Sequence, residues 1–408
     1  MQTSFPKDKI KVLLLEGIHQ SAVDAFKQAG YHNVELLPKA LPEAELCKKM
    51  ADVRLLGLRS KTQLNAKVLN SAPKLLAAGC FCIGTNQVDL NTATEKGVAV
   101  FNSPYSNTRS VAELVVAEIV MLMRRVPEKS QKAHQGIWTK SAEKSYEVRG
   151  KVLGIVGYGH IGSQVSVLAE AMGMKVFYYD IEPKLPLGNA TALESLDKLL
   201  AIADVLTLHV PSTGQTKNLI TANEINKMPK NSYLINLSRG NVVDIDALKH
   251  ALESGHLAGA GVDVFPKEPR EKGDLFTTPL QGVSNTILTP HIGGATQEAQ
   301  ENIGRDAAYK LINYLDKGVT VGSHTVPQLN LPLHSNAHRI LHVHKNMPGI
   351  LAQVNGVMEK ANVNIVAQHL ATNDKVGYVV FDVDQKTSEE VLKKLKKIKY
   401  TIRARVLY

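Results

Sequence analysis

A glycine-rich turn between an apolar stretch and a helical pattern constrains this 408-residue chain more than any other feature. Residues 152–156 read Val-Leu-Gly-Ile-Val, which is typical of a buried strand, and Gly157-Tyr-Gly159-His-Ile-Gly162 follows directly. The first glycine permits a tight turn, the second lets the backbone approach a diphosphate, and the third allows close packing of a helix on the strand. Because the start of a helix attracts anions, the segment predicts a dinucleotide-binding Rossmann domain.

The next apolar stretch, residues 176–179, ends at Asp180, about 20 residues beyond the glycines. A carboxylate at that place accepts a hydrogen bond from a ribose 2′-hydroxyl and repels a 2′-phosphate. The sequence therefore predicts NAD rather than NADP. An aspartate that only caps a loop is the alternative reading of Asp180.

Strands and helices alternate along two long parts of the chain, from residue 10 to 78 and from residue 151 to 288. That alternation predicts parallel sheets covered by helices. From residue 339 a shorter pattern runs strand, helix, strand, strand, helix, strand, which predicts a ferredoxin-like unit. The expected fold class is α/β, with two Rossmann-like doubly wound domains and a C-terminal βαββαβ domain.

Glycine and proline in the irregular stretch 316–338 indicate a linker before the last domain. We expect a discontinuous substrate-binding domain made of residues 1–106 and 295–332. The NAD-binding domain is expected at 107–294, the linker at 333–338 and the last domain at 339–408. The linker contains His-Ser-Asn-Ala-His and no paired glycines, which predicts a stiff connection.

The formal charge of +10 is unevenly distributed, because residues 339–408 contain 12 Lys or Arg and 6 acidic residues. Five of these lysines lie at 393–399 between apolar residues, so they predict the wet face of an amphipathic helix rather than a nucleic-acid patch. The most apolar helical pattern, 111–126, is interrupted by glutamates and is too short to span a bilayer. The three cysteines show no disulfide or metal spacing. We expect a cytoplasmic protein with no metal site and no nucleic-acid or membrane partner.

Three polar residues lie just past the ends of predicted strands in the second α/β stretch: Arg239, Glu268 and His291. Ligands of parallel sheets bind at the carboxyl ends of the strands. Oxidation of a 2-hydroxy acid needs a base for the hydroxyl proton, a cation for the carboxylate and a second carboxylate that tunes the base. Histidine, arginine and glutamate can supply these roles, although each residue could instead be structural.

Five segments together resemble the D-2-hydroxyacid dehydrogenase family: 154–162, 203–212, 235–244, 263–268 and 289–294. The resemblance implies that Arg239 binds the substrate carboxylate, that His291 is the acid/base and that Glu268 pairs with it. It also implies NAD contacts from Gly157, Gly159, His160, Ile161, Gly162, Asp180, His209, Leu237, Ser238, Arg239, Asp263, His291, Ile292, Gly293 and Gly294.

Further segments at 56–62, 79–89, 101–113 and 134–140 resemble the branch of this family that oxidises 3-phosphoglycerate. Arg59, Ser60 and Asn107 are donors suited to a phosphate, and Lys140 could add charge from its own or from a neighbouring subunit. The alternative is that Arg59 and Lys140 form only surface ion pairs. Rival functions are the reduction of another 2-oxo acid, such as glyoxylate or 2-oxoglutarate, and an NAD-sensing corepressor.

The last 70 residues resemble an ACT domain, a regulatory module that binds amino acids between paired copies. The resemblance implies feedback inhibition by L-serine in serine biosynthesis, and a homotetramer. We expect His344, Asn346 and Asn364 to form the effector site, because ends of neighbouring strands can converge. Asparagines that only hold turns are the alternative.

Overall fold

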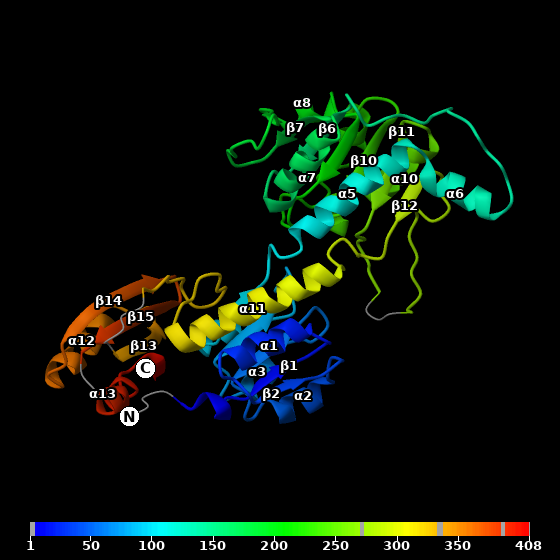
Figure 1. Ribbon diagram of the computed structural model, residues 1–408. Coiled ribbons are helices and arrows are strands. Elements are labelled where there is room, and N and C mark those ends of the chain that lie inside the picture. Colours follow the sequence, from blue (N-terminus) through cyan, green and yellow to red (C-terminus); the bar gives the residue numbers. More distant parts are fainter. Residues whose placement is uncertain (1–4, 270–272, 333–337, 385–387, 408) are drawn as a thin grey trace. The chain divides into compact units, whose positions relative to one another are not determined.

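The computed structural model describes residues 5–269, 273–332, 338–384 and 388–407. These residues divide into two compact units (Figure 1). The first unit joins Met1–Ser106 to Gln300–Tyr408, and the second is Asn107–Ala299. The expected fold class is confirmed in both. Of the expected linker 333–338, only His338 lies within the described residues.

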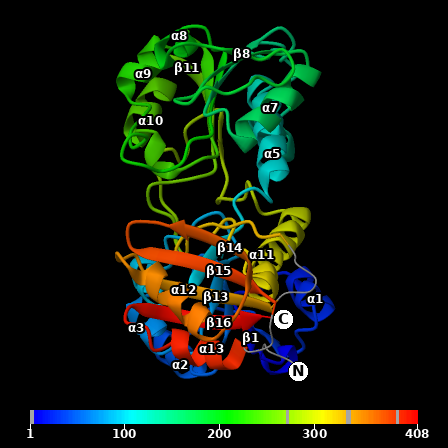
Figure 2. The same ribbon diagram turned by 90° about the vertical axis from the view of Figure 1, so that its left-hand side faces the viewer.

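The second unit is built on a parallel sheet with the strand order β12-β11-β10-β9-β6-β7-β8, the doubly wound order of dinucleotide-binding domains. Helices α8, α9 and α10 lie on one side of this sheet and α5 and α7 on the other (Figure 2). The strands are β6 (Val152–Val156), β7 (Lys175–Tyr179), β8 (Thr191–Ala192), β9 (Val205–Leu208), β10 (Ser232–Asn236), β11 (Leu257–Val262) and β12 (Thr286–Leu288). The helices are α5 (Thr108–Met123), α6 (Val126–His134), α7 (His160–Ala171), α8 (Leu196–Leu200), α9 (Ala222–Lys227) and α10 (Ile245–Glu253).

Alternate side chains of the central strands pack into the two hydrophobic cores of this unit. Tyr233 and Ile235 of β10 pack with α5 and α7, whereas Leu234 between them packs with α8, α9 and α10. A strand buried on both faces needs apolar residues throughout, which explains the continuous apolar runs in the sequence.

The first unit contains a second parallel sheet, with the order β2-β1-β3-β4-β5. Helices α1 and α11 cover one face, and α2, α3 and α4 cover the other. The strands are β1 (Val12–Leu14), β2 (Val34–Leu36), β3 (Leu55–Leu58), β4 (Ala77–Cys80) and β5 (Ala99–Asn102). The helices are α1 (Gln20–Gln28), α2 (Glu43–Lys49), α3 (Ala66–Asn70), α4 (Leu90–Glu95) and α11 (Gln297–Lys317).

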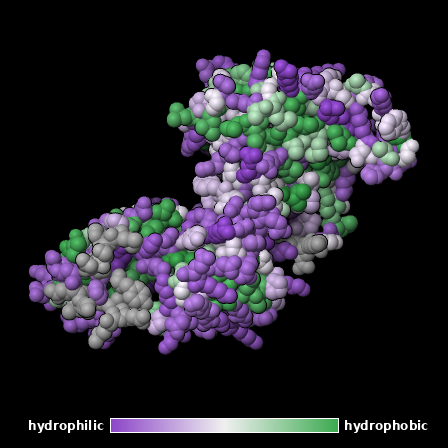
Figure 3. Space-filling model, in the orientation of Figure 1, coloured by the Kyte–Doolittle hydropathy of each residue, from purple (hydrophilic) through white to green (hydrophobic). Residues whose placement is uncertain are grey.

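The C-terminal residues form a four-stranded antiparallel sheet in the order β14-β15-β13-β16, with two helices on one face. Its elements are β13 (His338–Lys345), α12 (Ile350–Lys360), β14 (Ile365–Thr372), β15 (Val376–Val383), α13 (Ser388–Leu395) and β16 (Thr401–Leu407). This is the βαββαβ pattern expected from the sequence. Hydrophilic residues predominate at the tip of this region on the face shown in Figure 3.

The helix-free face of that sheet packs onto the parallel-sheet part of the first unit. Leu341 and Tyr378 lie in one core with Leu311 of α11. The Tyr378 hydroxyl donates to the carbonyl of Gly318, 2.7 Å away, and the buried Arg339 guanidinium pairs with Asp382 and donates to the carbonyl of Lys317. The sheet is therefore anchored to the C-terminal end of α11.

Helix α5 carries a buried carboxylate in an otherwise apolar face. Glu118 has no solvent exposure, and neither side-chain oxygen has a hydrogen-bond partner among the described residues. A Cβ placed on Gly261 of β11 would come within 2.2 Å of Glu118 Oε2, so only glycine fits beneath it. Burial, with a smaller contribution from Asp263, raises the pKa of Glu118 to about 8.

None of the helices in the described ranges is long and apolar enough to cross a membrane.

We predict that Glu118→Gln makes thermal stability less dependent on pH. The folded-state pKa of Glu118 lies above its unfolded value, so the wild type loses stability as the pH rises from about 4.5 through about 8. Glutamine has no such ionisation. Melting temperatures between pH 5 and 9 should therefore fall less steeply in the variant.

Glu113→Gln is the matched control, because Glu113 is exposed on the same helix and forms a surface ion pair with Arg109. It should melt like the wild type at every pH. Equal slopes in the wild type and in Glu118→Gln would show that Glu118 does not titrate in this range.

Candidate active site

The glycine-rich turn after β6 has the geometry that a bound diphosphate requires. Gly157 has φ +90, and a Cβ there would lie 2.7 Å from the carbonyl oxygen of His209. A Cβ on Gly162 would lie 2.2 Å from the carbonyl oxygen of Gly157, whereas the space at Gly159 is open. Helix α7 begins at His160, so the backbone N–H groups of its first turn, that of Ile161 among them, lie beside the glycine-rich turn, where the positive end of the helix dipole favours an anion. These residues fit the diphosphate of NAD.

Asp180 follows β7 and is held beside this turn. Its Oδ2 accepts from the backbone N–H of Tyr158 at 2.8 Å, and Oδ1 accepts from the N–H of Glu182 at 3.0 Å. The carboxylate is thus fixed at the carboxyl end of its strand with further acceptor capacity, as a ribose-binding group needs. The same two hydrogen bonds also mean that Asp180 caps the loops beside it, which was the alternative to a ribose-binding role.

Arg239 leaves β10 in a turn that Asn236 organises. The Asn236 side chain accepts from the N–H and hydroxyl of Ser238 and donates to the carbonyl of Arg239. The guanidinium donates back to the Ser238 carbonyl at 2.6 Å. Burial lowers the pKa of Arg239, yet arginine remains charged at neutral pH. Leu237 and Ser238 are buried at the base of the turn.

Asp263, just after β11, fixes the loop that follows β12. Its carboxylate accepts from the Thr289 hydroxyl at 2.6 Å and from the N–H groups of Ile292 and Gly293 at 2.7 and 2.8 Å. These bonds hold His291 at φ +54, a left-handed conformation that is unfavourable for a residue with a side chain. Asp263 therefore determines the direction in which His291 leaves the loop.

His291 and Glu268 form the ion-pairing contact of the site. His291 Nδ1 lies 2.8 Å from Glu268 Oε2, and the imidazole is about half exposed, at 52%. The hydrogen bond to Glu268 raises the pKa of His291, and burial acts in the opposite direction. Burial alone would raise the pKa of Glu268, but the hydrogen bond and charge of His291 lower it. Because Nδ1 is engaged with the carboxylate, Nε2 is the nitrogen left for proton transfer.

His209, at the end of β9, differs from His291 in its environment. Its Nε2 lies 3.0 Å from the Thr207 hydroxyl, and its buried Nδ1 has no partner among the described residues. Burial lowers the pKa of His209 to about 3, so the ring is neutral at physiological pH. A neutral histidine there can contact a cofactor without adding charge.

The residues expected to bind a phosphate lie on separate segments. Arg59 and Ser60 share the loop after β3 in the first unit. Asn107 precedes α5 in the second unit; it is 7% exposed and packs against Gly294, where a Cβ would lie 2.4 Å from its Nδ2. Lys140 is exposed in the segment between α6 and β6. Trp138 in that segment is 86% exposed, which excludes a role in the core of this chain.

The strand register corrects one expectation about the effector residues. His338 and Ile365 both pair with Val383, so β13 and β14 run in the same direction. Asn364, which precedes β14, is therefore level with the start of β13 on the far side of β15, while His344 and Asn346 lie at the end of β13, roughly 20 Å further along the strand at 3.3 Å per residue. The two strand ends do not converge within one chain, because two antiparallel pairings restore the original direction.

His344 is also more enclosed than a surface ligand would be. It is 1% exposed, stacks on His342 with ring centroids 5.2 Å apart, and would contact a Cβ on Gly377. Burial lowers the pKa of both histidines, that of His342 to about 3. Asn346 is exposed and donates to the carbonyl of Asn373.

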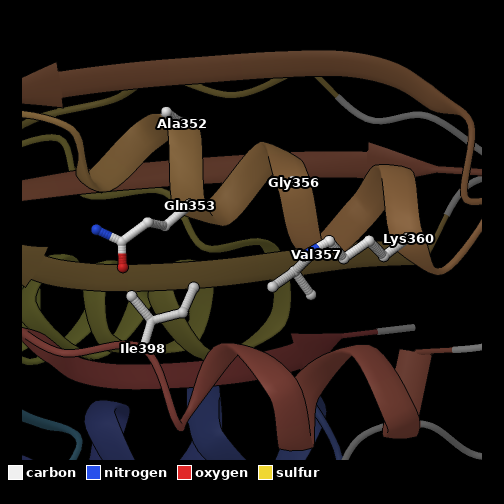
Figure 4. A pocket seen from close by; sticks show the side chains of 6 residues that line it. All are labelled: Ala352, Gln353, Gly356, Val357, Lys360 and Ile398. Carbon is white, nitrogen blue, oxygen red and sulfur yellow. The ribbon is translucent and has the colours of Figure 1, made fainter.

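A hollow of about 440 Å³ lies on the helical face of the C-terminal sheet (Figure 4). Ala352, Gln353, Gly356, Val357 and Lys360 of α12 line it together with Ile398. None of these is among the residues expected to bind substrate, NAD or serine.

Asn236 and Thr289 support the site but were not among the residues predicted for it. Each is a polar residue at or just after the end of an apolar strand, which is the signal that could have identified it. Their partners, the turn 237–239 and Asp263, become visible only once the strands are aligned. Sequence spacing alone does not show which strand end faces which.

Comparisons with known proteins agree with this geometry. The family described as "D-isomer specific 2-hydroxyacid dehydrogenase, NAD binding domain" matches residues 116–293, and an "AHAS small subunit-like ACT domain" matches residues 340–403. A D-3-phosphoglycerate dehydrogenase of Haemophilus influenzae is 54% identical over 407 residues, covering 100% of this chain and 99% of that protein. One from Escherichia coli K12 is 53% identical over 409 residues, with 100% of each chain covered.

A solved D-lactate dehydrogenase of Aquifex aeolicus, complexed with NAD and lactic acid, is similar with a TM-score of 0.65. It is 28% identical, and the match covers 78% of this chain and 100% of that one. The chain belongs to the D-isomer specific 2-hydroxyacid dehydrogenase family. The expected NAD cofactor and the ACT domain are thereby confirmed.

We predict that Glu268→Gln moves the pH profile of kcat/KM for hydroxy-acid oxidation toward lower pH. A His291 that accepts the hydroxyl proton, the role implied by the family resemblance, must have a neutral imidazole, so that role predicts that activity falls below the pKa of His291. Since Glu268 raises that pKa, loss of its charge lowers it, and the acid limb of the profile follows.

Glu253→Gln serves as a control, because Glu253 pairs with Lys249 on the exposed side of α10. Its profile should match that of the wild type. A Glu268→Gln profile that also stays in place would argue against coupling between the carboxylate and His291.

Proposed function

We propose that this enzyme oxidises 3-phospho-D-glycerate to 3-phosphooxypyruvate with NAD, at the start of serine biosynthesis. The observation that carries the proposal is the His291–Glu268 pair, 2.8 Å apart, with His291 inside the loop that Asp263 fixes. The high identity to D-3-phosphoglycerate dehydrogenases along the whole chain supports the choice of substrate.

In the proposed reaction the C2 hydroxyl of the substrate loses its proton to Nε2 of His291. The C2–H bond breaks with its electron pair, and NAD, when bound, supplies the hydride acceptor. Glu268 stabilises the imidazolium that forms, because its carboxylate accepts from Nδ1–H. Arg239 binds the substrate carboxylate and polarises the developing carbonyl, as a planar guanidinium with several donors can.

We further propose that NAD contacts Gly157, Gly159, His160, Ile161 and Gly162 through its diphosphate and Asp180 through its ribose. Further NAD contacts are proposed for residues at the other strand ends: His209, Leu237, Ser238, Arg239, Asp263 and His291 to Gly294. The collision distances at Gly157 and Gly162 support the first assignment, because side chains there would fill the turn. Arg59, Ser60, Asn107 and Lys140 are proposed to bind the phosphate.

Arg59→Ala should raise KM for 3-phosphoglycerate by on the order of tenfold or more, the effect of losing a charge-assisted hydrogen bond. Turnover of D-glycerate, which lacks the phosphate, should change little. Steady-state kinetics at saturating NAD compare the two substrates. Equal losses on both would contradict the phosphate assignment, and wild-type enzyme that prefers glyoxylate or 2-oxoglutarate would contradict the proposed substrate.

We propose L-serine as the effector, bound between two paired copies of the ACT domain. Serine presents a carboxylate, an ammonium and a hydroxyl. An amide side chain can donate to the carboxylate through its NH2 and accept from the ammonium or hydroxyl through its oxygen. The roughly 20 Å between strand ends requires that His344 and Asn346 come from one copy and Asn364 from the other. Serine inhibits only if it binds the less active state more tightly.

Asn346→Ala and Asn364→Ala should each raise the serine concentration for half-inhibition by about tenfold or more, since each removes hydrogen bonds to a charged ligand. Uninhibited turnover should remain close to wild type. Lys396→Ala, an exposed change on the same domain, is the control and should leave inhibition intact. An effect of only one asparagine variant would contradict a site shared between copies.

A homotetramer and a cytoplasmic location complete the proposal. Ile137 and Trp138 are 50% and 86% exposed in the segment after α6, which supports contact with another subunit there. All three cysteines are free, which fits a reducing compartment.

A further inference from the structure

Glu16 lies two residues past the end of β1, and its carboxylate contacts the loop that follows β3. Glu16 Oε1 accepts from the backbone N–H of Arg59 at 3.1 Å and of Thr62 at 2.8 Å. Glu16 Oε2 accepts from the N–H of Lys61 at 3.0 Å. One side chain therefore binds three of the four peptide N–H groups in the loop that carries Arg59 and Ser60.

The peptide carbonyl of Arg59 is held from the other direction by Gln87. Gln87 Nε2 donates to the Arg59 carbonyl at 2.8 Å, and the Gln87 side chain is nearly buried, with the residue 7% exposed. The same amide also contacts Cys82 Sγ at 3.3 Å. Side chains from two other segments thus fix both polar groups of the Arg59 backbone.

Glu16 itself adopts an unfavourable backbone conformation. Its φ is +63, in the left-handed region, and Gly17 after it has φ +61. Its N–H donates to the carbonyl of Lys39 after β2 at 3.3 Å, and that of Gly17 donates to the carbonyl of Leu37 at 3.0 Å. The turn directs the Glu16 carboxylate toward the loop after β3. The residue with the unfavourable backbone conformation is therefore the one that binds the N–H groups of that loop.

The Glu16 carboxylate is negative, as is the substrate phosphate that we expect at the same loop. A negative group beside a phosphate-binding loop repels the phosphate, and its charge alone should weaken binding. The three N–H donors face the carboxylate directly, which is the strong, charge-assisted kind of hydrogen bond. The contacts therefore point to a geometric role that outweighs the repulsion.

We propose that Glu16, assisted by Gln87, is a positioning residue for recognition of the substrate phosphate. It fixes the loop 59–62 so that the Arg59 guanidinium and the Ser60 hydroxyl are preorganised for a phosphate monoester. The inference rests on the proposed function, since it assumes that this loop binds the phosphate of 3-phosphoglycerate.

The test is the ratio of kcat/KM for 3-phosphoglycerate to kcat/KM for D-glycerate in Glu16→Gln. Glutamine offers one oxygen in place of two, and its NH2 would face the N–H of Lys61. A positioning role predicts that the ratio falls about tenfold, the effect of losing a charge-assisted bond. If Glu16 acted through its charge alone, removing the charge would raise the ratio. General destabilisation would lower both constants and leave the ratio unchanged.

Two further variants make the test robust to misfolding. Gln87→Met keeps the side-chain volume but removes the donor to the Arg59 carbonyl, so it should lower the same ratio. Glu16→Asp retains the charge and should recover part of the loss. Glu35→Gln on β2, a partly buried glutamate that pairs with Lys49, is the matched control and should keep the wild-type ratio.

A ratio within twofold of wild type in both Glu16→Gln and Gln87→Met, or a higher one in Glu16→Gln, would overturn the inference. A wild-type enzyme that does not prefer 3-phosphoglycerate over D-glycerate would instead overturn the proposed function. The two failures are thus distinguishable.

Discussion

The hydrogen bonds that the Asp263 carboxylate accepts are the interaction on which the proposed reacting centre depends. It accepts one hydroxyl and two backbone N–H groups from the loop after β12 and holds His291 in a left-handed conformation. Without these bonds the loop would relax to a more favourable backbone geometry, and the imidazole would no longer meet Glu268. Asp263 can do this only because β11 and β12 are adjacent parallel strands whose carboxyl ends lie together.

The same arrangement recurs at the other strand ends. Asp180 after β7 and Glu16 after β1 each accept a backbone N–H from the turn after a neighbouring strand, and Asn236 at the end of β10 accepts the N–H of Ser238 in the turn after its own strand. In each case a polar side chain at the carboxyl end of a strand orders a loop that carries functional residues. Rigid loops position charged groups without the entropy cost of ordering them at each binding event.

Much of this could be predicted from the sequence, and the rest could not for identifiable reasons. The glycine turn at 157–162 and the strand-end positions of Arg239, Glu268 and His291 follow from local pattern. The partners of Glu16, Gln87 and Glu118 depend on which strands are neighbours, which spacing does not reveal. The separation of Asn364 from His344 and Asn346 depends on the register of the sheet. The order of the strands along the chain wrongly suggested that the strand ends next to these residues converge. The exposure of Trp138 likewise follows only from packing.

We propose that His291, oriented by Glu268 and by the loop that Asp263 fixes, exchanges the substrate proton. The most direct measurement is steady-state oxidation of 3-phosphoglycerate by His291→Asn together with equilibrium NAD binding. If His291 is the acid/base, kcat falls about 10²-fold or more, the usual contribution of general acid–base catalysis, while NAD affinity stays close to wild type. A kcat within a few-fold of wild type in a variant that still binds NAD would contradict it.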